Sequence, residues 1–334
     1  MSKSKSVLGA AHFHDEAAAF AYLEEKLWPQ GPVCPKCGGE GYALNGVKDK
    51  KGRERLGLKK CRACRSQFTL RIGTIFEDSH APLHLWLQAI ALMAASKKGI
   101  SSNQLSRVLG VQLKTAWHMS HRIRLAMAPA GNLPPMGGAG KVVEVDETYF
   151  GKVANPTELK TDGTPFKSKR KRGHGGGRGG SNKRAVVALI ERGGSARTFH
   201  VAEANVATVA QIVRENVDMA SALHTDASSL YKRLGREFAD HQTVEHSMGE
   251  YVRWNENGAI HNNSAESYFS VFKRGMKGVY QHCSEKHLHR YLAEFDYRHN
   301  TRVALGMDDK ARAEKLITQV VGKRLTYQTA DRPA

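Results

Sequence analysis

Four cysteines near the start of the chain form two C-x-x-C pairs, a spacing that suits metal binding. The sequence C-P-K-C occupies positions 34–37 and C-R-A-C occupies positions 61–64. Each turn aims two thiolates to one side, and two such turns can close a tetrahedron around Zn²⁺. The 23 residues between the pairs are enough for a small β-ribbon. We therefore predict one structural zinc ion, bound by Cys34, Cys37, Cys61 and Cys64.

Two other chemistries use the same cysteine spacing. A redox site needs only one C-x-x-C motif, and a pair of disulfides needs an oxidising compartment. No apolar signal segment precedes the first pair, so zinc is the preferred interpretation. Cys283 stands far from the others in a polar helical stretch, and we expect it to be a free thiol.

Two aspartates are predicted to stand at the ends of β-strands. Asp146 comes after the β-run Val142–Val145, and Asp226 comes after Ala222–Thr225. Carboxylates delivered from the ends of neighbouring strands can share divalent cations. A single aspartate at a strand end is more often a turn or cap residue, so the interpretation depends on a third group elsewhere in the chain.

The segment 261–275, HNNSAESYFSVFKRG, supplies further polar groups. As a helix it has one polar and one apolar face. The polar face carries Asn263, Glu266, Ser270 and Lys273, and the apolar stripe carries Ala265, Phe269, Phe272 and Met276. Such a face presents two oxygen ligands and then a cation. The alternative is a capping box, with Asn263 as N-cap and Glu266 three residues later.

A mixed α/β domain is required to bring these residues together. Strands are expected at 142–145, 185–190, 198–201, 222–225 and 243–246, and helices at 206–217, 265–276, 286–297 and 309–321. This order predicts a mixed sheet flanked by helices.

The N-terminal part is predicted to be helical around the cysteine module. Helices are expected at 13–28, 84–95, 101–109 and 113–127, with Gly110 between the last two. Two helices joined by a tight glycine turn have the outline of a helix-turn-helix. The last helix is expected to have an apolar stripe of Leu113, Ala116, Trp117, Ile123 and Met127. Its polar face, either DNA-binding or merely solvated, is expected to carry Lys114, His118, His121 and Arg122.

The segment 151–184, between the first two expected strands, is strongly basic. It contains ten Lys and Arg residues against two acids and is rich in glycine. Such a composition cannot bury a core, so we expect phosphate contacts, with a solvated linker as the alternative. The candidate residues are Lys169, Arg170, Lys171, Arg172 and Arg178.

The whole chain is also basic, with 51 Lys and Arg residues against 32 Asp and Glu and a formal charge of +19. Basic surfaces release condensed counterions from nucleic acid, so DNA is the expected partner. No apolar run approaches the ~20 residues of a membrane span. We expect a cytoplasmic, nucleoid-associated protein with no membrane partner.

Three stretches carry a resemblance to a known family. They are EVDETYFG at 144–151, the segment 261–275, and QHCSEKHLHRYLAEFDYRHN at 281–300. Together with the four-cysteine module, they make nearly the whole chain similar to bacterial insertion-sequence transposases of the zinc-ribbon, ISXO-like group (insertion-sequence family 1595).

The resemblance implies a ribonuclease-H-like catalytic domain and DDE-type chemistry with two Mg²⁺ or Mn²⁺ ions. By motif, Asp146 is the first metal ligand and Asp226 the second. Members have either Asn or Glu at the third position, followed by Lys, and this chain offers both Asn263 and Glu266 before Lys273. We favour Glu266, because a carboxylate neutralises Mg²⁺ and an amide oxygen does not.

The same resemblance implies that the N-terminal modules bind terminal inverted repeats in double-stranded DNA. Water would free a 3′-OH at the end of the element, and that hydroxyl would then attack target DNA within a homo-oligomeric complex. Two alternatives are a structure-specific nuclease of the same fold and a DNA-binding regulator with an inactive catalytic domain.

The motifs and linkers divide the chain into six expected parts. These are an N-terminal helix (1–30), a zinc ribbon (31–72), a helical DNA-binding domain (73–128), a Pro/Gly-rich linker (129–140), the catalytic domain (141–302) and a C-terminal helix and tail (303–334).

Overall fold

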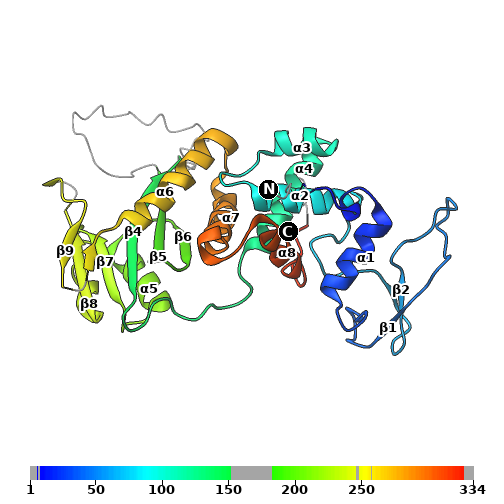
Figure 1. Ribbon diagram of the computed structural model, residues 1–334, viewed down its shortest axis with the longest axis horizontal. Coiled ribbons are helices and arrows are strands. Elements are labelled where there is room, and N and C mark those ends of the chain that lie inside the picture. Colours follow the sequence, from blue (N-terminus) through cyan, green and yellow to red (C-terminus); the bar gives the residue numbers. More distant parts are fainter. Residues whose placement is uncertain (1–5, 7, 152–182, 246–247, 257, 327–334) are drawn as a thin grey trace, which may run out of the picture. The chain divides into compact units, whose positions relative to one another are not determined.

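The computed structural model describes residues 6, 8–151, 183–245, 248–256 and 258–326. The chain divides into two compact units (Figure 1). The first contains Met1–Asn132, Lys277–Tyr280 and Ala293–Ala334, and the second contains Leu133–Met276 and Gln281–Leu292.

The first unit begins with a helix and a small antiparallel sheet. A short 3₁₀ turn (Ala11–Phe13) precedes α1 (Glu16–Leu27). Asp15 caps α1, because its Oδ1 accepts a hydrogen bond from the Ala18 N–H at 2.7 Å. The sheet has the order β1 (Gly41–Ala43), β2 (Lys59–Cys61), β3 (Gln67–Phe68).

Four further helices complete this unit. They are α2 (Leu83–Ala95), α3 (Ser102–Leu109), α4 (Leu113–Met127) and α8 (Asp309–Thr318), with a 3₁₀ turn at Val303–Leu305. Their core includes the fully buried side chains of Trp86, Met93 and Ile123. Gly110 ends α3 with a positive φ of 65°, a conformation that glycine adopts without steric cost.

The second unit is built on a five-stranded mixed sheet. The strands are β4 (Val142–Phe150), β5 (Arg184–Glu191), β6 (Ala196–Val201), β7 (Ala222–Asp226) and β8 (Asp240–Val244), in the spatial order β6-β5-β4-β7-β8. The β4–β5 and β5–β6 pairs are antiparallel, whereas β4–β7 and β7–β8 are parallel. Glu144 of β4 stands opposite His224 of β7.

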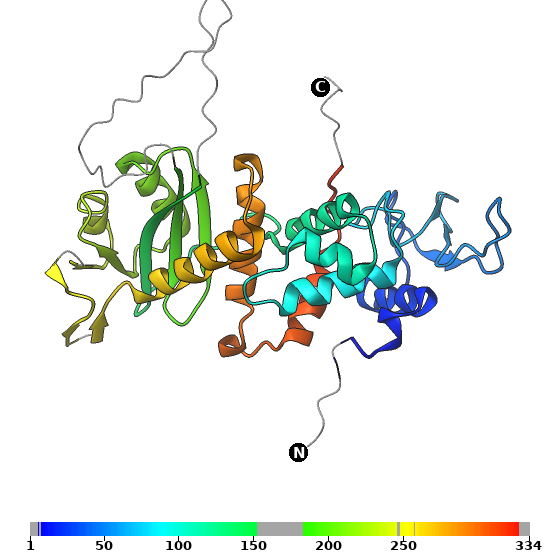
Figure 2. The same ribbon diagram turned by 90° about the horizontal axis from the view of Figure 1, so that it is seen from above.

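Helices cover both faces of this sheet (Figures 1 and 2). On one face, α5 (Val206–Asn216) packs its Val209 and Val213 against Val143 and Val145 of β4. The other face receives α6 (Asn263–Gly275), whose Phe272 ring meets Phe150 edge-on at 5.5 Å. Because side chains alternate along a strand, the even-numbered residues of β4 point toward α6.

The remaining elements of the second unit are short. They are a 3₁₀ turn at Leu234–Glu237, the hairpin β9 (Arg253–Asn255) and β10 (Gly258–Ile260), and a second 3₁₀ turn at Glu285–His287. Two elements contain residues of both units: a π-helical turn, Met276–Tyr280, which continues α6, and the helix α7, Leu288–Asn300.

The structure confirms the predicted mixed sheet with flanking helices, and each strand and helix expected within the described residues is present with shifted ends. The predicted apolar stripe of α6 is buried as expected. The largest error in a strand boundary is in β4, which continues beyond Asp146 to Phe150 through its pairing with β5. None of the helices in the described part of the chain is long and apolar enough to cross a membrane.

Candidate functional site

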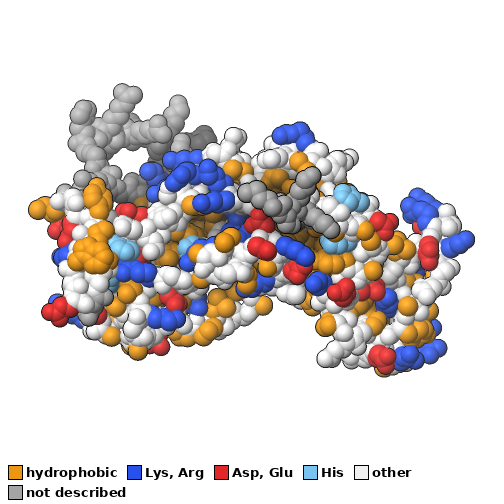
Figure 3. Space-filling model, viewed as in Figure 1, with side chains coloured by type: hydrophobic (Ala, Val, Ile, Leu, Met, Phe, Trp, Pro, Cys, Tyr) orange, Lys and Arg blue, Asp and Glu red, His pale blue; other side chains and the backbone are white. Residues whose placement is uncertain are grey.

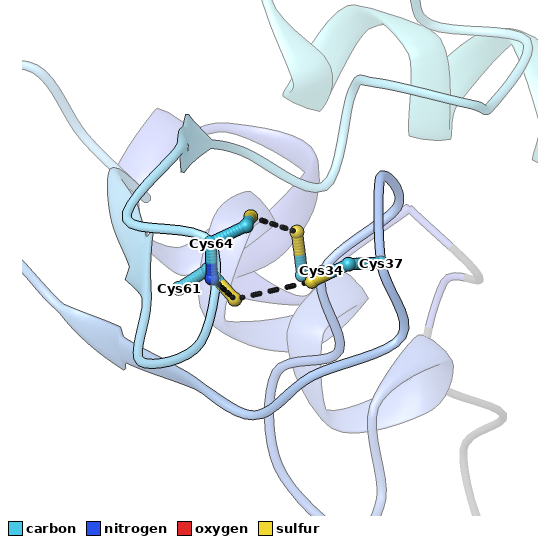
Figure 4. A group of neighbouring side chains, drawn as sticks. All are labelled: Cys34, Cys37, Cys61 and Cys64. Atoms are coloured by element: carbon cyan, nitrogen blue, oxygen red, sulfur yellow. Dashed lines mark hydrogen bonds between the residues drawn. The ribbon is translucent and has the colours of Figure 1, made fainter.

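The four cysteines of the two C-x-x-C pairs lie together in the first unit (Figure 4). Their sulfur atoms all fall within 4.8 Å of one another. The Sγ atoms of Cys34 and Cys64 are 3.7 Å apart, and those of Cys37 and Cys61 are 3.5 Å apart. Cys34 and Cys61 are buried against Phe68.

This sulfur arrangement fits a zinc ion. Zinc–sulfur bonds of about 2.3 Å in a tetrahedron place neighbouring sulfurs roughly 3.8 Å apart, close to the two distances above. The ion belongs among the β1–β2–β3 loops, where it would replace the core that so small a sheet lacks.

The two aspartates of the second unit lie on one face of the sheet. Glu144 and His224 stand opposite each other on the parallel strands β4 and β7. Asp146 and Asp226 lie two residues beyond them, so both point to the side that α6 covers. Asp226 is the last residue of β7, as predicted.

Asp146 is partly buried and is surrounded by other carboxylates. Burial raises the pKa of Asp146 to about 8, and the charges of Glu147 and Asp226 contribute further, with a smaller contribution from Glu266. A carboxylate so destabilised is relieved either by a proton or by a bound cation. The four carboxylates therefore act on one another electrostatically, although three different elements carry them.

Glu147 lies on the opposite face of β4 from Asp146. Its Oε2 accepts a hydrogen bond from the hydroxyl of Tyr231, a fully buried residue in the core beneath α5. Burial raises the pKa of Glu147, and that of Tyr231 is raised well above its usual value by burial and by Glu147. The phenol therefore stays protonated and donates to this carboxylate.

The alternative interpretation of α6, a capping box with Asn263 as N-cap, does not match the start of the helix. The N-cap position is Asn262, whose side chain makes no capping hydrogen bond, and Asn263 is the first residue of the helix. The cap comes from β4, because Glu144 Oε2 accepts hydrogen bonds from the N–H groups of Ser264 at 2.7 Å and Ala265 at 3.1 Å. Glu266 thus lies exposed in the first turn, and the capping role that the alternative gave it belongs to Glu144.

The carboxylates fit a divalent cation by chemistry but are not drawn together. Within the described residues, the cysteines form the one group of three or more His, Cys, Asp or Glu side chains whose ligand atoms lie within 4.8 Å of one another. The oxygens of Asp146, Asp226 and Glu266 are therefore more widely spaced than that. Hard oxygen ligands are those that Mg²⁺ and Mn²⁺ prefer.

One predicted DNA contact on α4 was wrong. Arg122 is buried, and its guanidinium donates to the backbone carbonyls of Ile75 at 2.8 Å, Leu325 at 3.0 Å and Glu77. His121, expected on the same polar face, is fully buried. The reason is that α4 is enclosed by other elements from Met119 onward, so charge along a helix did not indicate exposure.

The other predicted DNA contacts have different outcomes. Lys114 is exposed in the first turn of α4, and His118 is half-buried. Lys169, Arg170, Lys171, Arg172 and Arg178 lie outside the described residues. The expected apolar stripe of α4 also begins later than predicted, because Leu113 is 49% exposed.

The last turn of α6 carries Lys273 and Arg274. Figure 3 shows Lys and Arg side chains gathered over this end of the helix. Lys273 is half-buried and Arg274 is exposed, with its Nη2 donating to Ser270 Oγ at 2.6 Å. Lys273 therefore lies on α6 as the sequence predicted, with a second basic residue next to it.

Sequence reasoning missed the buried partners of these residues. Glu144 has no exposed surface and is held by Arg192, whose Nε and Nη2 lie 3.0 and 2.9 Å from Glu144 Oε1. A charged residue inside a Val-rich strand was the available signal, since an unpaired charge is very rarely buried. Nothing in the sequence pointed to Arg192 as its partner.

Two protein-family models match the chain. The ISXO2-like transposase domain matches residues 137–300, which include both aspartates and all of α6. The transposase zinc-ribbon domain matches residues 14–67, which include all four cysteines of the ribbon. A comparison with curated proteins finds no match.

Proposed function

The chain belongs to the insertion-sequence family 1595 of transposases, and we propose that it cleaves DNA at the ends of its element and joins the freed 3′-OH to target DNA. The observation that carries this proposal is the negative cluster around Asp146 on the α6 face of the sheet. A DDE-type enzyme needs such a cluster to bind divalent cations next to the scissile phosphate.

We assign the metal ligands to Asp146, Asp226 and Glu266. Two Mg²⁺ or Mn²⁺ ions bound there would activate the attacking oxygen and stabilise the leaving 3′-oxygen. Asp146 and Asp226 are delivered by neighbouring parallel strands, and Glu266 is delivered by the first turn of the helix above them. Asn263 stands three residues earlier and would contribute at most a neutral oxygen.

Lys273 is assigned to phosphate binding. It stands in the last turn of α6, two turns after Glu266. A lysine ammonium is a compact point charge that suits a phosphate of the DNA strand. Because Arg274 follows Lys273 at the end of α6, the two cations would hold the DNA backbone at the end of the helix farther from Glu266.

The order and direction of the strands support a ribonuclease-H-like fold for the second unit. Three antiparallel strands are followed by a crossover helix and two strands parallel to the first one. In this arrangement, the first and fourth strands along the chain lie side by side and deliver the two aspartates.

The zinc ribbon and the α3–α4 pair are proposed to recognise the terminal repeats. Exposed polar residues on this pair are Gln104 and Arg107 of α3 and Lys114 of α4. They replace the buried Arg122 as candidates for DNA contact. Bringing two ends of the element together requires at least two copies of the chain, so we propose a homo-oligomer in the DNA complex.

A strand-transfer assay tests the proposal. The probe is a duplex that carries the terminal sequence flanking the gene, incubated with plasmid target and Mg²⁺. Wild-type protein is expected to give joined products, and Asp226→Ala is expected to give none while still binding the duplex. Asp218→Ala, a change at an exposed aspartate before β7, is the matched control and is expected to join normally.

The same assay separates the alternative functions. Cleavage without joined products would indicate a structure-specific nuclease. Binding without cleavage, in both the wild type and Asp226→Ala, would indicate a DNA-binding regulator.

A further inference from the structure

An ion pair between a buried glutamate and a partly exposed arginine connects the three elements that carry the proposed metal ligands. Glu144 of β4 stands two residues before Asp146 and has no exposed surface. Arg192 comes directly after β5 and places two N–H groups on Glu144 Oε1, at 3.0 and 2.9 Å. A carboxylate that accepts two such N–H groups has a fixed orientation.

Glu144 also holds the start of α6. Its Oε2 accepts from the N–H groups of Ser264 and Ala265, and its Oε1 accepts from the Ser264 hydroxyl at 3.0 Å. The first turn of a helix leaves its N–H groups without partners and carries a partial positive charge, so a carboxylate is well suited to this position. The first turn that carries Glu266 is thereby tied to the strand that carries Asp146.

Arg192 extends the connection to the remaining ligand strand. Its Nη2 lies 3.2 Å from His224 Nδ1, on β7 two residues before Asp226. Its Nη1 donates to the carbonyl of Ala259 at 2.7 Å, and its Nη2 to that of His261 at 3.1 Å. One guanidinium thus contacts β4, β7, the end of β10 and the residues that lead into α6.

We infer that Glu144 and Arg192 are positioning residues, which set how β4, β7 and α6 converge so that Asp146, Asp226 and Glu266 can share cations. This inference rests on the proposed function. Partners behind metal ligands orient them, and their removal lowers metal affinity by about 10–100-fold. Displacements of about 1 Å at such a site lower the rate by about 100-fold.

Stability alone is a weaker explanation for this pair. Buried ion pairs contribute little net stability compared with apolar residues of similar size. An apolar pair would fill the same volume, but it would leave the Ser264 and Ala265 N–H groups unsatisfied and would not align the helix with both strands.

The test compares Glu144→Gln with a matched control, Glu191→Gln. Glu191 ends β5 and forms an ion pair with the exposed Lys141 at 2.7 Å, and among the described residues none of its hydrogen bonds involves α6 or β7. Three measurements are made on the full-length protein: Mn²⁺ affinity by electron paramagnetic resonance, hydrogen exchange of the 258–270 region, and single-turnover cleavage of the terminal duplex. End binding is measured alongside.

We expect Glu144→Gln to bind Mn²⁺ about tenfold more weakly and to lose amide protection in the first turn of α6. Cleavage should fall by about 100-fold while end binding changes less than twofold. Glu191→Gln should match the wild type in all four. Arg192→Lys, which keeps the charge but not the fork of donors, should weaken Mn²⁺ binding in the same direction.

The inference is overturned if Glu144→Gln binds Mn²⁺ and cleaves as the wild type does. If end binding and zinc content fall together with cleavage, Glu144→Gln is generally unfolded, and Arg192→Lys then decides by the same Mn²⁺ measurement. Wild-type Mn²⁺ affinity of Arg192→Lys would in that case overturn the inference. A separate comparison tests the proposed function: if Asp146→Ala binds Mn²⁺ as tightly as the wild type, the metal site itself is wrong, whatever Glu144→Gln does.

Discussion

The zinc ribbon and the proposed carboxylate site of this transposase differ in how the chain supplies their ligands. The ribbon takes all four ligands from positions 34–64, and their sulfur atoms already lie within 4.8 Å of one another. The proposed carboxylate site would take its ligands from positions 146, 226 and 266, and the described structure does not bring their oxygens within that spacing. The ribbon ligands are close in sequence and close in space. The proposed carboxylate ligands are far apart in sequence and more widely spaced.

The difference arises from the contacts that hold each region together. The ribbon has three strands of two or three residues and very little core, so its ligand geometry and its fold depend on the same ion. Asp146 and Asp226 stand on the α6 side of a sheet whose hydrophobic core lies on the α5 side. Metal removal should therefore unfold the first region and leave the second one folded.

The largest expected effect is the loss of zinc. Cys61→Ser should abolish zinc binding and unfold the ribbon, because structural zinc contributes about 10–16 kcal/mol to folding in small modules at neutral pH. Zinc content and hydrogen exchange of residues 34–68 are the measurements, with β4 expected to stay protected. Cys283→Ser, at a cysteine outside the ribbon, is the control. Full zinc content in Cys61→Ser would refute the four-cysteine site.

The second prediction concerns the carboxylate site without metal. Burial and neighbouring charges raise the pKa of Asp146 from 3.8 to about 8. A group whose pKa is higher in the folded state contributes stability below its unfolded pKa and loses it as the pH rises through the folded value. In chelator, protection of β4 should therefore fall between about pH 4 and pH 8.

Asp146→Asn should remove most of that pH dependence, and at pH 8 it should be more stable than the wild type by roughly 2–5 kcal/mol. Added Mg²⁺ should restore the protection of β4 in the wild type and have little effect on that protection in Asp146→Asn. The measurement is hydrogen exchange of β4 peptides, corrected for intrinsic rates. A β4 stability that rises between pH 4 and 8 in chelator would contradict the negative cluster.

The third prediction concerns a residue of the first unit whose contribution to stability falls, rather than rises, as the pH is lowered. Burial lowers the pKa of His299, at the end of α7, to about 4, with a further contribution from Arg302. A histidine kept neutral by burial contributes stability above its unfolded pKa of 6.5, and this is lost as the pH falls toward 4. Replacement by Gln should reduce the acid sensitivity of α7 by about 3 kcal/mol at most. Identical acid unfolding of His299→Gln and wild type would show that this residue is not responsible.

The smallest expected effect concerns DNA affinity. The first unit has 29 Lys and Arg residues against 15 Asp and Glu, and the second has 22 against 17. Ten of the 22 basic residues of the second unit fall in positions 151–184. Deleting 167–178 should therefore lower the salt dependence of binding, by about 0.9 in the slope of log K against log salt for each lost phosphate contact. An unchanged slope would show that this segment does not contact DNA.

The sequence predicted most elements because local signals agreed with the fold. Asp15 at the start of α1, Gly110 after α3 and the two C-x-x-C turns each encode their own conformation. The ribbon was therefore predictable down to its ligands.

The open site was predictable only in part. Its candidate carboxylates could be named from the sequence, but the pairing of Glu144 with Arg192 joins residues 48 positions apart in the chain through a fold that no local pattern encodes. Arg122 shows the same limit, because its burial depends on Ile75 and Leu325, which are distant in sequence. Long-range contacts decide which charges face solvent.

The most direct test of the carboxylate site is single-turnover cleavage of the terminal duplex in Mg²⁺ by Glu266→Gln and Asn263→Ala, side by side. Both residues stand in the first turn of α6, but only Glu266 adds a negative charge to the cluster at Asp146. We predict that Glu266→Gln lowers the cleavage rate by at least about 1000-fold with end binding intact, and that Asn263→Ala lowers it less than about tenfold. Cleavage by Glu266→Gln at a near wild-type rate, together with an inactive Asn263→Ala, would contradict the assignment and make Asn263 the third ligand.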